Sequence, residues 1–561
     1  MNASSQNYDA IVIGSGITGG WAAKELTEAG LNTLVLEAGP LVIPERDYTE
    51  HVPAWDMRYR GMGDRKKLDE RQAVQKECYA CDELGSAFFV DDVDNPYTTE
   101  PDEPFLFLRG RQVGGRSIMW GRQVYRMSDL DFEANEREGV GVDWPIRYAD
   151  LEPWYEHVER FIGVSGEALG LPQLPDSHFL PAMEMTCAER FVQTGMARAY
   201  GNERTLTIGR CAVLTQDHLG REACHYCGPC ERGCRTRSYF SSLNATLPAA
   251  EATGRMTLRP NSVVHTLGYR DGKIASVHVT DRETGQQLEF SGRVVFLGAS
   301  TLESTRLLLN SKSADFPDGL ANGSGALGRY LMDHTMGHGA QGRVPGFEDP
   351  SNENRRLNGI YLPRFRNVTD TSPDFQRGFA YQGSGSRQGW GRGVSTEGIG
   401  ADFKRSLTEP GPWRMNLYGF GECLPDERNR VELDPVVTDA WGVPALKIRC
   451  KWRDNELAMF EDMAVSAAEM LEAAGVRDVT MFHEDNPPGK TIHEMGTARM
   501  GRDPDTSVLN GFNQAHDVAN LFVIDGSCMA SSANQNPSLT YMALTARACD
   551  FAVQSMRRME L

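Results

Sequence analysis

The sequence predicts an α/β protein whose first part is a parallel βαβ unit. Residues 9–14, DAIVIG, form the short apolar run that is typical of a buried parallel strand. A glycine-rich turn and a helical stretch up to Gly30 follow, and a second strand, LNTLVLE, ends at Glu37. Further along, residues 456–474 have apolar positions at helical spacing, including Leu457, Phe460 and Leu471, which predicts an amphipathic helix covering a sheet.

The glycine turn has the spacing of a Rossmann-like dinucleotide site. Gly14 permits the tight turn, Gly16 lets the backbone approach a pyrophosphate, and Gly19 lets helix and strand pack closely. The helix N-terminus offers free N–H groups to the phosphates. Glu37 stands 23 residues after Gly14, where an acid accepts hydrogen bonds from ribose hydroxyls. A purely structural glycine turn is the alternative, and strand, turn, helix, strand and acid in this order favour dinucleotide binding.

Composition narrows the class of protein. The chain has 561 residues, 40% of them hydrophobic, which is enough for a large core. Its formal net charge of −19 argues against binding a nucleic-acid backbone. No apolar run reaches the roughly 18 residues that span a membrane, so we expect no transmembrane segment. The opening residues, MNASSQNYDAIVIG, lack the basic and apolar parts of an export signal.

Four of the twelve cysteines crowd into residues 224–234, CHYCGPCERGC. The spacing C-x2-C-x2-C-x3-C is that of iron–sulfur ligands in bacterial ferredoxins, although Arg235 replaces the usual proline. Zinc, disulfides and free thiols remain alternatives. Cys78 and Cys81 show no partner pair in sequence and are expected to be structural, and Cys211 is expected to lie in the core.

Three further motifs carry a family resemblance. They are RGRQVGGRSIMWGR at 109–122, HEMGTARMG at 493–501 and LFVIDGSCMASSANQNPSLT at 521–540. With these motifs the chain resembles the glucose–methanol–choline (GMC) oxidoreductases, FAD enzymes that oxidise alcohols and sugars. The resemblance covers residues 8–45, 107–126, 236–335 and 425–555.

The resemblance implies how FAD is held. Besides the first glycine turn and Glu37, it assigns cofactor contacts to Gly114, Gly115, Ser117, Val264, Asp525, Gly526, Asn536 and Pro537. For Val264 the alternative is an ordinary buried strand at 263–267. Pyranose oxidases place a covalently flavin-linked histidine before the tryptophan of the GG motif. Here Met119 precedes Trp120, so we expect non-covalent FAD.

The resemblance also implies the catalytic pair. His493 occupies the histidine of the family's HxxGT motif, and its residue type suits removal of a hydroxyl proton. Asn536, before Pro537, matches the second polar residue, which orients the hydroxyl and bonds the developing alkoxide. His334 and His516 are secondary candidates, for which a hydrogen-bonded structural role is expected.

One branch of the family, the sugar and glycoside dehydrogenase catalytic subunits, resembles the cysteine segment. Its three-cysteine spacing maps onto Cys224, Cys230 and Cys234 as ligands of a 3Fe-4S cluster. Cys227 is then spare, or it is the fourth ligand of a 4Fe-4S cluster. The nearest resemblance is to glucoside 3-dehydrogenase subunits, which oxidise a secondary ring hydroxyl at carbon 3. Related assemblies include a small subunit that carries the export signal and a cytochrome electron acceptor.

These implications give an overall hypothesis. Residues 1–345 form the mainly FAD-binding half with the cysteine cluster, and 491–561 return to it with the catalytic pair. Residues 346–490, with parts of 45–105 and 130–210, form an inserted antiparallel-sheet substrate domain, in which 383–400 is either a lid or a surface loop.

The expected activity is oxidation of a sugar or glycoside hydroxyl, with electrons leaving through the cluster. An oxygen-using pyranose or C-glycoside oxidase and a catalytically silent electron-transfer flavoprotein are the alternatives. For location we expect the periplasm, by export with the partner subunit and with association at the inner membrane. A cytoplasmic location is the alternative.

Overall fold

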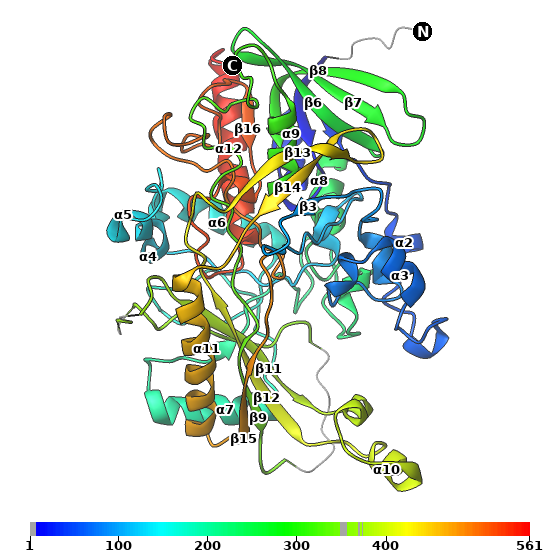
Figure 1. The fold of residues 1–561 in the computed structure, drawn as a ribbon, viewed down its shortest axis with the longest axis vertical. Helices are drawn as coiled ribbons and strands as arrows, with labels where there is room; N and C mark the ends of the chain where they lie inside the picture. The colour runs from blue at the N-terminus through cyan, green and yellow to red at the C-terminus, as the bar shows by residue number, and fades with distance from the viewer. Residues whose placement is uncertain (1–6, 348–355, 369–370, 373) are drawn as a thin grey trace.

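A computed structural model describes residues 7–347, 356–368, 371–372 and 374–561 and contains three sheets (Figure 1). The first has seven strands in the order β5-β2-β1-β8-β7-β6, with β16 beside β8. Strands β5, β2, β1, β8 and β16 run parallel to one another, and the hairpin of β6 and β7 continues the sheet antiparallel to β8. The strands are β1 (Asn7–Ile13), β2 (Thr33–Leu36), β5 (Met256–Arg259), β6 (Ser262–Arg270), β7 (Lys273–Asp281), β8 (Gln287–Leu297) and β16 (Leu521–Val523).

The parallel sheet takes its strands from three distant parts of the chain. The apolar run of β1 is fully buried, as a central parallel strand requires, and it lies between β2 and β8. Helices from both ends of the chain pack against this region: α1 (Ile17–Glu28), α6 (Tyr148–Ile162), α8 (Leu247–Ala252) and α12 (Ser538–Arg557). The expected α/β fold is confirmed.

The second sheet has six strands in the order β15-β9-β12-β11-β10-β4 and is antiparallel. It occupies the opposite end of the molecule from the parallel sheet (Figure 1). Its strands are β4 (Thr207–Ile208), β9 (His338–Arg343), β10 (Ile360–Leu362), β11 (Phe379–Arg387), β12 (Trp413–Gly421) and β15 (Arg477–His483). Strand β4 comes from residues 130–210, and β9 lies just before residue 346.

The predicted amphipathic helix is α11 (Asp454–Ala473), and it packs on β9, β12 and β15. Its buried face includes three methionines, Met459, Met463 and Met470. The expectation for Leu457 was wrong, because its side chain is 54% exposed. Helix α7 (Cys187–Tyr200) covers β11 and β12 as well.

The stretch 383–400 divides into two parts. Residues up to Arg387 belong to β11 and are paired with β12. Beyond them the chain runs to an exposed tip, where Trp390, Val394 and Ile399 are 81%, 97% and 93% exposed.

The remaining elements connect the two sheets. A three-stranded sheet contains β3 (Thr98–Thr99), β13 (Arg430–Thr438) and β14 (Pro444–Arg449). The other helices are α2 (Pro44–Asp47), α3 (Arg65–Arg71), α4 (Asp129–Phe132), α5 (Ala134–Glu138), α9 (Thr301–Asn310) and α10 (Gly400–Ser406). In the described ranges, none of the helices has the length and apolar character needed to cross a bilayer.

Candidate active site

A cavity of about 1190 Å³ is lined by residues from the parallel sheet, the antiparallel sheet and the loops between them. At one end lie the first glycine turn and the strand that ends at Glu37. At the other end lie residues of β11 and β12, among them Gln382, Ser384 and Asn416. His493 and Asn536 line the same cavity, so a molecule bound along it contacts both sheets.

Each glycine of the first turn meets a different requirement. Gly14 has φ +95°, a left-handed conformation that L side chains rarely adopt. A Cβ at Gly19 would lie 1.9 Å from the Gly14 carbonyl oxygen, so helix α1 could not approach β1 with any larger residue. A Cβ at Gly16 would have no heavy atom within 4 Å, which leaves the N-terminus of α1 open to the cavity. This turn fits a pyrophosphate.

Glu37 lines the cavity and is tied to both glycine turns. Its carboxylate accepts from the Ser15 hydroxyl at 2.6 Å and from the Gly39 N–H at 2.9 Å. The Ser15 hydroxyl in turn accepts from the Gly114 N–H at 3.1 Å. The acid is therefore fixed at the end of β2, with a rim position suited to ribose hydroxyls.

The second glycine turn lies directly against the first. A Cβ at Gly115, which has φ +51°, would stand 3.0 Å from Gly16 Cα. The Ser117 hydroxyl donates to the Gly114 carbonyl at 2.5 Å and accepts from the Ser242 N–H at 3.0 Å. Gly115 and Ser117 line the cavity, whereas Gly114 lies behind them with its Cβ position against Leu243.

The remaining assigned FAD contacts lie along the same cavity. Val264, in β6, lines it, as do Asp525, Gly526 and Pro537. Asp525 accepts from the hydroxyls of Ser304 and Ser527, and burial raises its pKa. Of the residues assigned to FAD, those that do not line the cavity are Gly19 and Gly114, which shape the two turns. The open cradle at Gly16 and the continuous lining fit FAD.

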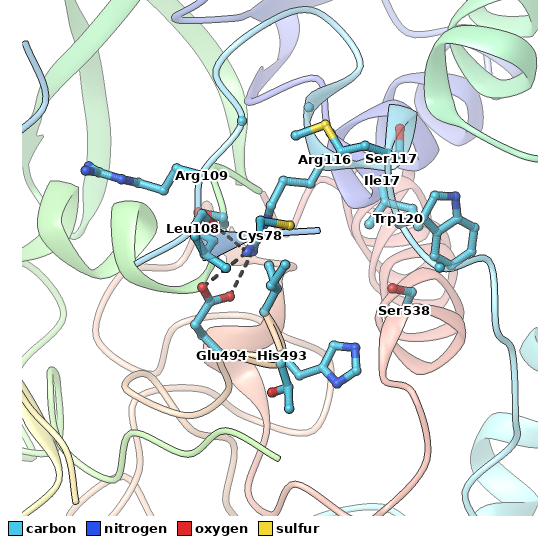
Figure 2. A pocket seen from close by; sticks show the side chains of 18 of the residues that line it. Ile17, Cys78, Leu108, Arg109, Arg116, Ser117, Trp120, His493, Glu494 and Ser538 are labelled. Carbon is cyan, nitrogen blue, oxygen red and sulfur yellow. Dashed lines mark hydrogen bonds and ion pairs between the residues drawn. The ribbon is translucent and has the colours of Figure 1, made fainter. Parts of the chain in front are cut away.

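His493 is held by its backbone and by a second histidine. Its N–H donates to the Asp333 carboxylate at 3.1 Å, and that carboxylate also accepts from the Gly489 N–H at 2.7 Å. Its ring lies 2.9 Å from the His334 ring, Nδ1 to Nδ1. Figure 2 shows the His493 ring pointing away from the side chain of Glu494.

The hydrogen bonds define the tautomers of the two rings. Burial lowers the pKa of His334 to about 4, so this ring is neutral and carries one hydrogen. Its Nε2 faces the Ser532 carbonyl at 3.3 Å, which can only accept, so the hydrogen is on Nε2. The His334 Nδ1 is then an acceptor, and His493 Nδ1 must donate to it.

The consequence is a free basic nitrogen. With its hydrogen on Nδ1, a neutral His493 has an unprotonated Nε2. Burial, then His334 and Arg116, lower the pKa of His493 well below the ordinary range, so the ring is neutral at neutral pH. Such a nitrogen can accept a hydroxyl proton.

Asn536 directly precedes Pro537 and helix α12, and its Oδ1 accepts from Gln382 Nε2 at 2.8 Å. Both side chains line the cavity, so an amide from the C-terminal segment meets an amide from the antiparallel sheet. A carboxamide oriented in this way can donate an N–H to a substrate oxygen.

Comparison with known proteins identifies the family. Residues 8–336 and 425–545 match the two family models described as GMC oxidoreductase, together well over half of the chain. The chain belongs to the GMC oxidoreductase family. It is accordingly an FAD-dependent oxidoreductase that acts on CH–OH donors.

The relatives agree with this assignment. The GMC chain is 29% identical to 2-methyl-1,2-propanediol dehydrogenase of Mycolicibacterium austroafricanum, covering 98% of this chain and 96% of the relative. It is 25% identical to the fructose dehydrogenase large subunit of Gluconobacter japonicus, over the full length of both. Its fold matches the crystal structure of pyridoxine 4-oxidase from Mesorbium loti with a TM-score of 0.62, at 18% identity over 97% of this chain and 99% of that one.

The cysteine segment of this GMC chain lies beside the cavity. Gly228 and Glu231 line the cavity, and Cys224, Cys230 and Cys234 meet in one apolar cluster with Cys211. Backbone N–H groups donate to two of the sulfurs, to Cys224 at 3.4 Å and to Cys234 at 3.3 Å. Hydrogen bonds of this kind also occur at the cysteine ligands of iron–sulfur clusters. Within the described part of the chain, no three His, Cys, Asp or Glu side chains are gathered closely enough to hold a metal.

Sequence reasoning missed several cavity residues. Arg116 and Glu494 form a two-bonded ion pair, at 2.9 and 3.1 Å, next to His493 (Figure 2). Arg116 lies in the motif at 109–122 and Glu494 in the motif at 493–501, so their position in these motifs could have indicated a place at the site. Gln123 and Gln382 had no such signal. Cys78, expected to be structural, lies at the cavity wall in a buried apolar cluster with Cys81 and Met119.

Two other expectations concern single residues. His516 bonds the Ser507 hydroxyl at 3.0 Å and does not line the cavity, so its role is structural. Cys211 is fully buried.

Proposed function

We propose that the chain is the catalytic subunit of a dehydrogenase that oxidises a secondary hydroxyl of a sugar or glycoside, at carbon 3 of the ring. The observation that carries the proposal is the neutral His493, which lines a cavity together with Asn536. An alcohol that is losing a hydride needs an acceptor for its hydroxyl proton and a donor for its oxygen. These two side chains offer one of each.

FAD, when bound, would supply the acceptor for the hydride of the carbinol carbon. The protein groups act on the oxygen. Nε2 of His493 takes the hydroxyl proton, and the Asn536 N–H stabilises the oxygen as its negative charge develops. Asp333 holds the backbone of His493, so the ring is positioned before substrate arrives.

The cavity wall formed by the antiparallel sheet supports the proposed substrate class. It is lined by amides and hydroxyls, including Gln382, Ser384, Ser386 and Asn416, which suit the several hydroxyls of a sugar ring. The likeness to a fructose dehydrogenase subunit supports the same class. The likeness to a 1,2-diol dehydrogenase favours a smaller alcohol as the second candidate.

The electron route is the second part of the proposal. Cys224, Cys230 and Cys234 would hold a 3Fe-4S cluster, with Cys227 as the fourth ligand if the cluster is 4Fe-4S. A cluster of this kind supplies one-electron transfer to a protein acceptor. The position of Gly228 and Glu231 on the cavity wall supports this role, since it brings the loop next to the flavin site.

We further propose a cytochrome acceptor and a small subunit that carries the export signal, with the complex in the periplasm. The likeness to a protein named as a large subunit supports a multi-subunit enzyme. Co-purification from the source cell, with the small subunit identified by mass spectrometry, tests this part. Recovery of the active enzyme as a single chain from the cytoplasm would contradict it.

The activity is tested anaerobically with a panel of methyl β-D-glucopyranoside, D-glucose, D-fructose and 1,2-propanediol. The expected result is rapid loss of the oxidised flavin spectrum with the glucoside and formation of the 3-keto product, seen by NMR. Slow re-oxidation by oxygen and fast re-oxidation by a one-electron dye would separate a dehydrogenase from an oxidase. Acid precipitation should release the flavin to the supernatant. Reduction by none of these alcohols contradicts the proposal.

A further inference from the structure

We propose that Gln382, supported by Gln123 and Tyr125, fixes the orientation of the Asn536 amide so that its N–H group faces the substrate oxygen. Gln382 is thus a positioning residue on the antiparallel sheet. The inference rests on the proposed role of Asn536 in alcohol oxidation.

Four side chains form one line of hydrogen bonds. The Tyr125 hydroxyl donates to Gln123 Oε1 at 2.5 Å. Gln123 Nε2 then donates to Gln382 Oε1, and Gln382 Nε2 donates to Asn536 Oδ1 at 2.8 Å. Three carboxamides in series therefore connect a buried tyrosine to the catalytic amide.

The tyrosine gives the line its direction. Tyr125 is fully buried, and burial raises its pKa well above the usual range, so the hydroxyl keeps its hydrogen. A carboxamide oxygen can only accept, so this hydrogen selects the Oε1 end of Gln123. Every amide after it is then oriented by its neighbour. In the reverse direction the buried hydroxyl hydrogen would lack the acceptor it has now, which costs free energy.

The antiparallel sheet fixes Tyr125 and Gln382 relative to each other. Tyr125 stacks on Tyr361 with ring centroids 3.8 Å apart and an angle of 17° between the planes. Tyr361, in β10, stands opposite Gln382, in β11, in the register of the two strands. The strand pair β10–β11 therefore carries Gln382 and also the ring on which Tyr125 stacks.

The result is a complementary pair of groups on the substrate oxygen. Because its Oδ1 is occupied by Gln382, Asn536 has its Nδ2 hydrogens left for the cavity. His493 offers a bare Nε2, because its Nδ1 hydrogen is used by His334. One side chain can only donate and the other can only accept, which matches a hydroxyl that loses its proton.

The test is Gln382→Glu, which keeps the shape and removes the donor. A carboxylate facing Asn536 can only accept, so the Asn536 amide turns over and presents Oδ1 to the substrate. Removing a donor to a developing oxyanion costs on the order of 10²–10³-fold in rate. We expect the limiting rate of anaerobic flavin reduction to fall by about 10²-fold, with the substrate dissociation constant changed by less than about threefold. The substrate is the alcohol of the panel that reduces the wild-type flavin fastest.

Two further variants separate orientation from general damage. Gln341→Glu introduces the same change on β9 of the same sheet, outside the cavity, and should leave flavin reduction near wild type. Asn536→Ala should by itself lose about as much as Gln382→Glu. In the double variant Gln382→Glu with Asn536→Ala, the second change should add less than about threefold, because the two act on one bond. FAD content and Tm are measured for each protein.

The outcomes are distinct. Loss in Gln382→Glu that disappears in the Asn536→Ala background supports the positioning role. Full activity of Gln382→Glu, with Asn536→Ala impaired, overturns that role and leaves the proposed function standing. An unimpaired Asn536→Ala overturns the proposed role of Asn536 and the inference with it. An undiminished effect of Gln382→Glu in the double variant shows that Gln382 acts by another route and also refutes the inference.

Discussion

Replacing His334 should impair proton removal although His334 is not placed to contact substrate oxygen. In the native site His493 donates its Nδ1 hydrogen to His334 at 2.9 Å, which leaves Nε2 basic. In His334→Ala this acceptor is gone. A buried N–H without a partner costs about 1–3 kcal/mol, so the ring favours the other tautomer, with the hydrogen on Nε2.

The magnitude follows from that cost. If only the minor tautomer reacts, a bias of about 1–3 kcal/mol lowers the rate of flavin reduction by roughly 5- to 150-fold. His334→Asn places a carboxamide oxygen near the position of the ring Nδ1 and should recover a large part of the rate. If His334 only supported the fold, His334→Asn would not be expected to reduce the flavin faster than His334→Ala.

The assay is stopped-flow reduction of the bound flavin by substrate without oxygen. His338→Ala is the matched control, because His338 is a buried histidine that bonds another histidine, His483, at 3.3 Å and does not line the cavity. It should reduce at the wild-type rate once FAD content is matched. A His334→Ala enzyme within twofold of wild type, or an Asn replacement no better than Ala, would refute the tautomer argument.

Three further predictions concern pH, metal and the glycine turn. Burial lowers the pKa of His493 below the ordinary value of about 6.5. The rate of flavin reduction should therefore stay constant through pH 6.5 and fall only in more acidic solution. An inflection at or above pH 6.5 in the pH-rate profile would count against a neutral base. Anaerobically purified protein should contain roughly three irons per flavin, together with acid-labile sulfide. Cys230→Ser should lower the iron content, whereas the control Cys187→Ser, in α7, should not. Full flavin content without iron would make the cysteines structural. Gly19→Ala should lower the Tm of the FAD-free protein, since its Cβ would lie 1.9 Å from the Gly14 oxygen. Gly16→Ala, whose Cβ would have no heavy atom within 4 Å, should weaken FAD binding and leave that Tm unchanged. If the two variants had equal effects on Tm and on FAD binding, the two glycines would not have separate roles.

The first glycine turn could be predicted from sequence because its requirements are local. Gly14, Gly16 and Gly19 act within one strand, one turn and one helix, and their spacing specifies which backbone atoms approach each other. The acid at Glu37 follows from the length of the same unit. The resemblance extended this to His493 and Asn536, because both stand inside recognisable motifs.

The partners of the catalytic pair could not be predicted in this way. Gln382 reaches Asn536 across 154 positions of sequence, a contact between β11 and the C-terminal segment that exists only in the folded chain. His334 was foreseen as a residue near the site, but its bond to His493 requires a tertiary contact. The apolar pattern correctly predicted that α11 is an amphipathic helix. It did not predict which residues face the sheet, because the buried face includes methionines and Leu457 is exposed.

The two reacting side chains have their chemistry set from outside their own segment. His493 and Asn536 come from the C-terminal return to the parallel domain, but the hydrogen on His493 is placed by His334, just before β9, and the amide of Asn536 is turned by Gln382 in β11. A neutral histidine and a carboxamide each have two usable orientations of similar intrinsic energy, so position alone does not make one a base and the other a donor. The contacts from the antiparallel side remove that ambiguity. The inserted sheet therefore completes the reacting groups as well as enclosing the cavity, and a flavin domain with the same motifs but a different insert would need other residues to make the same two choices.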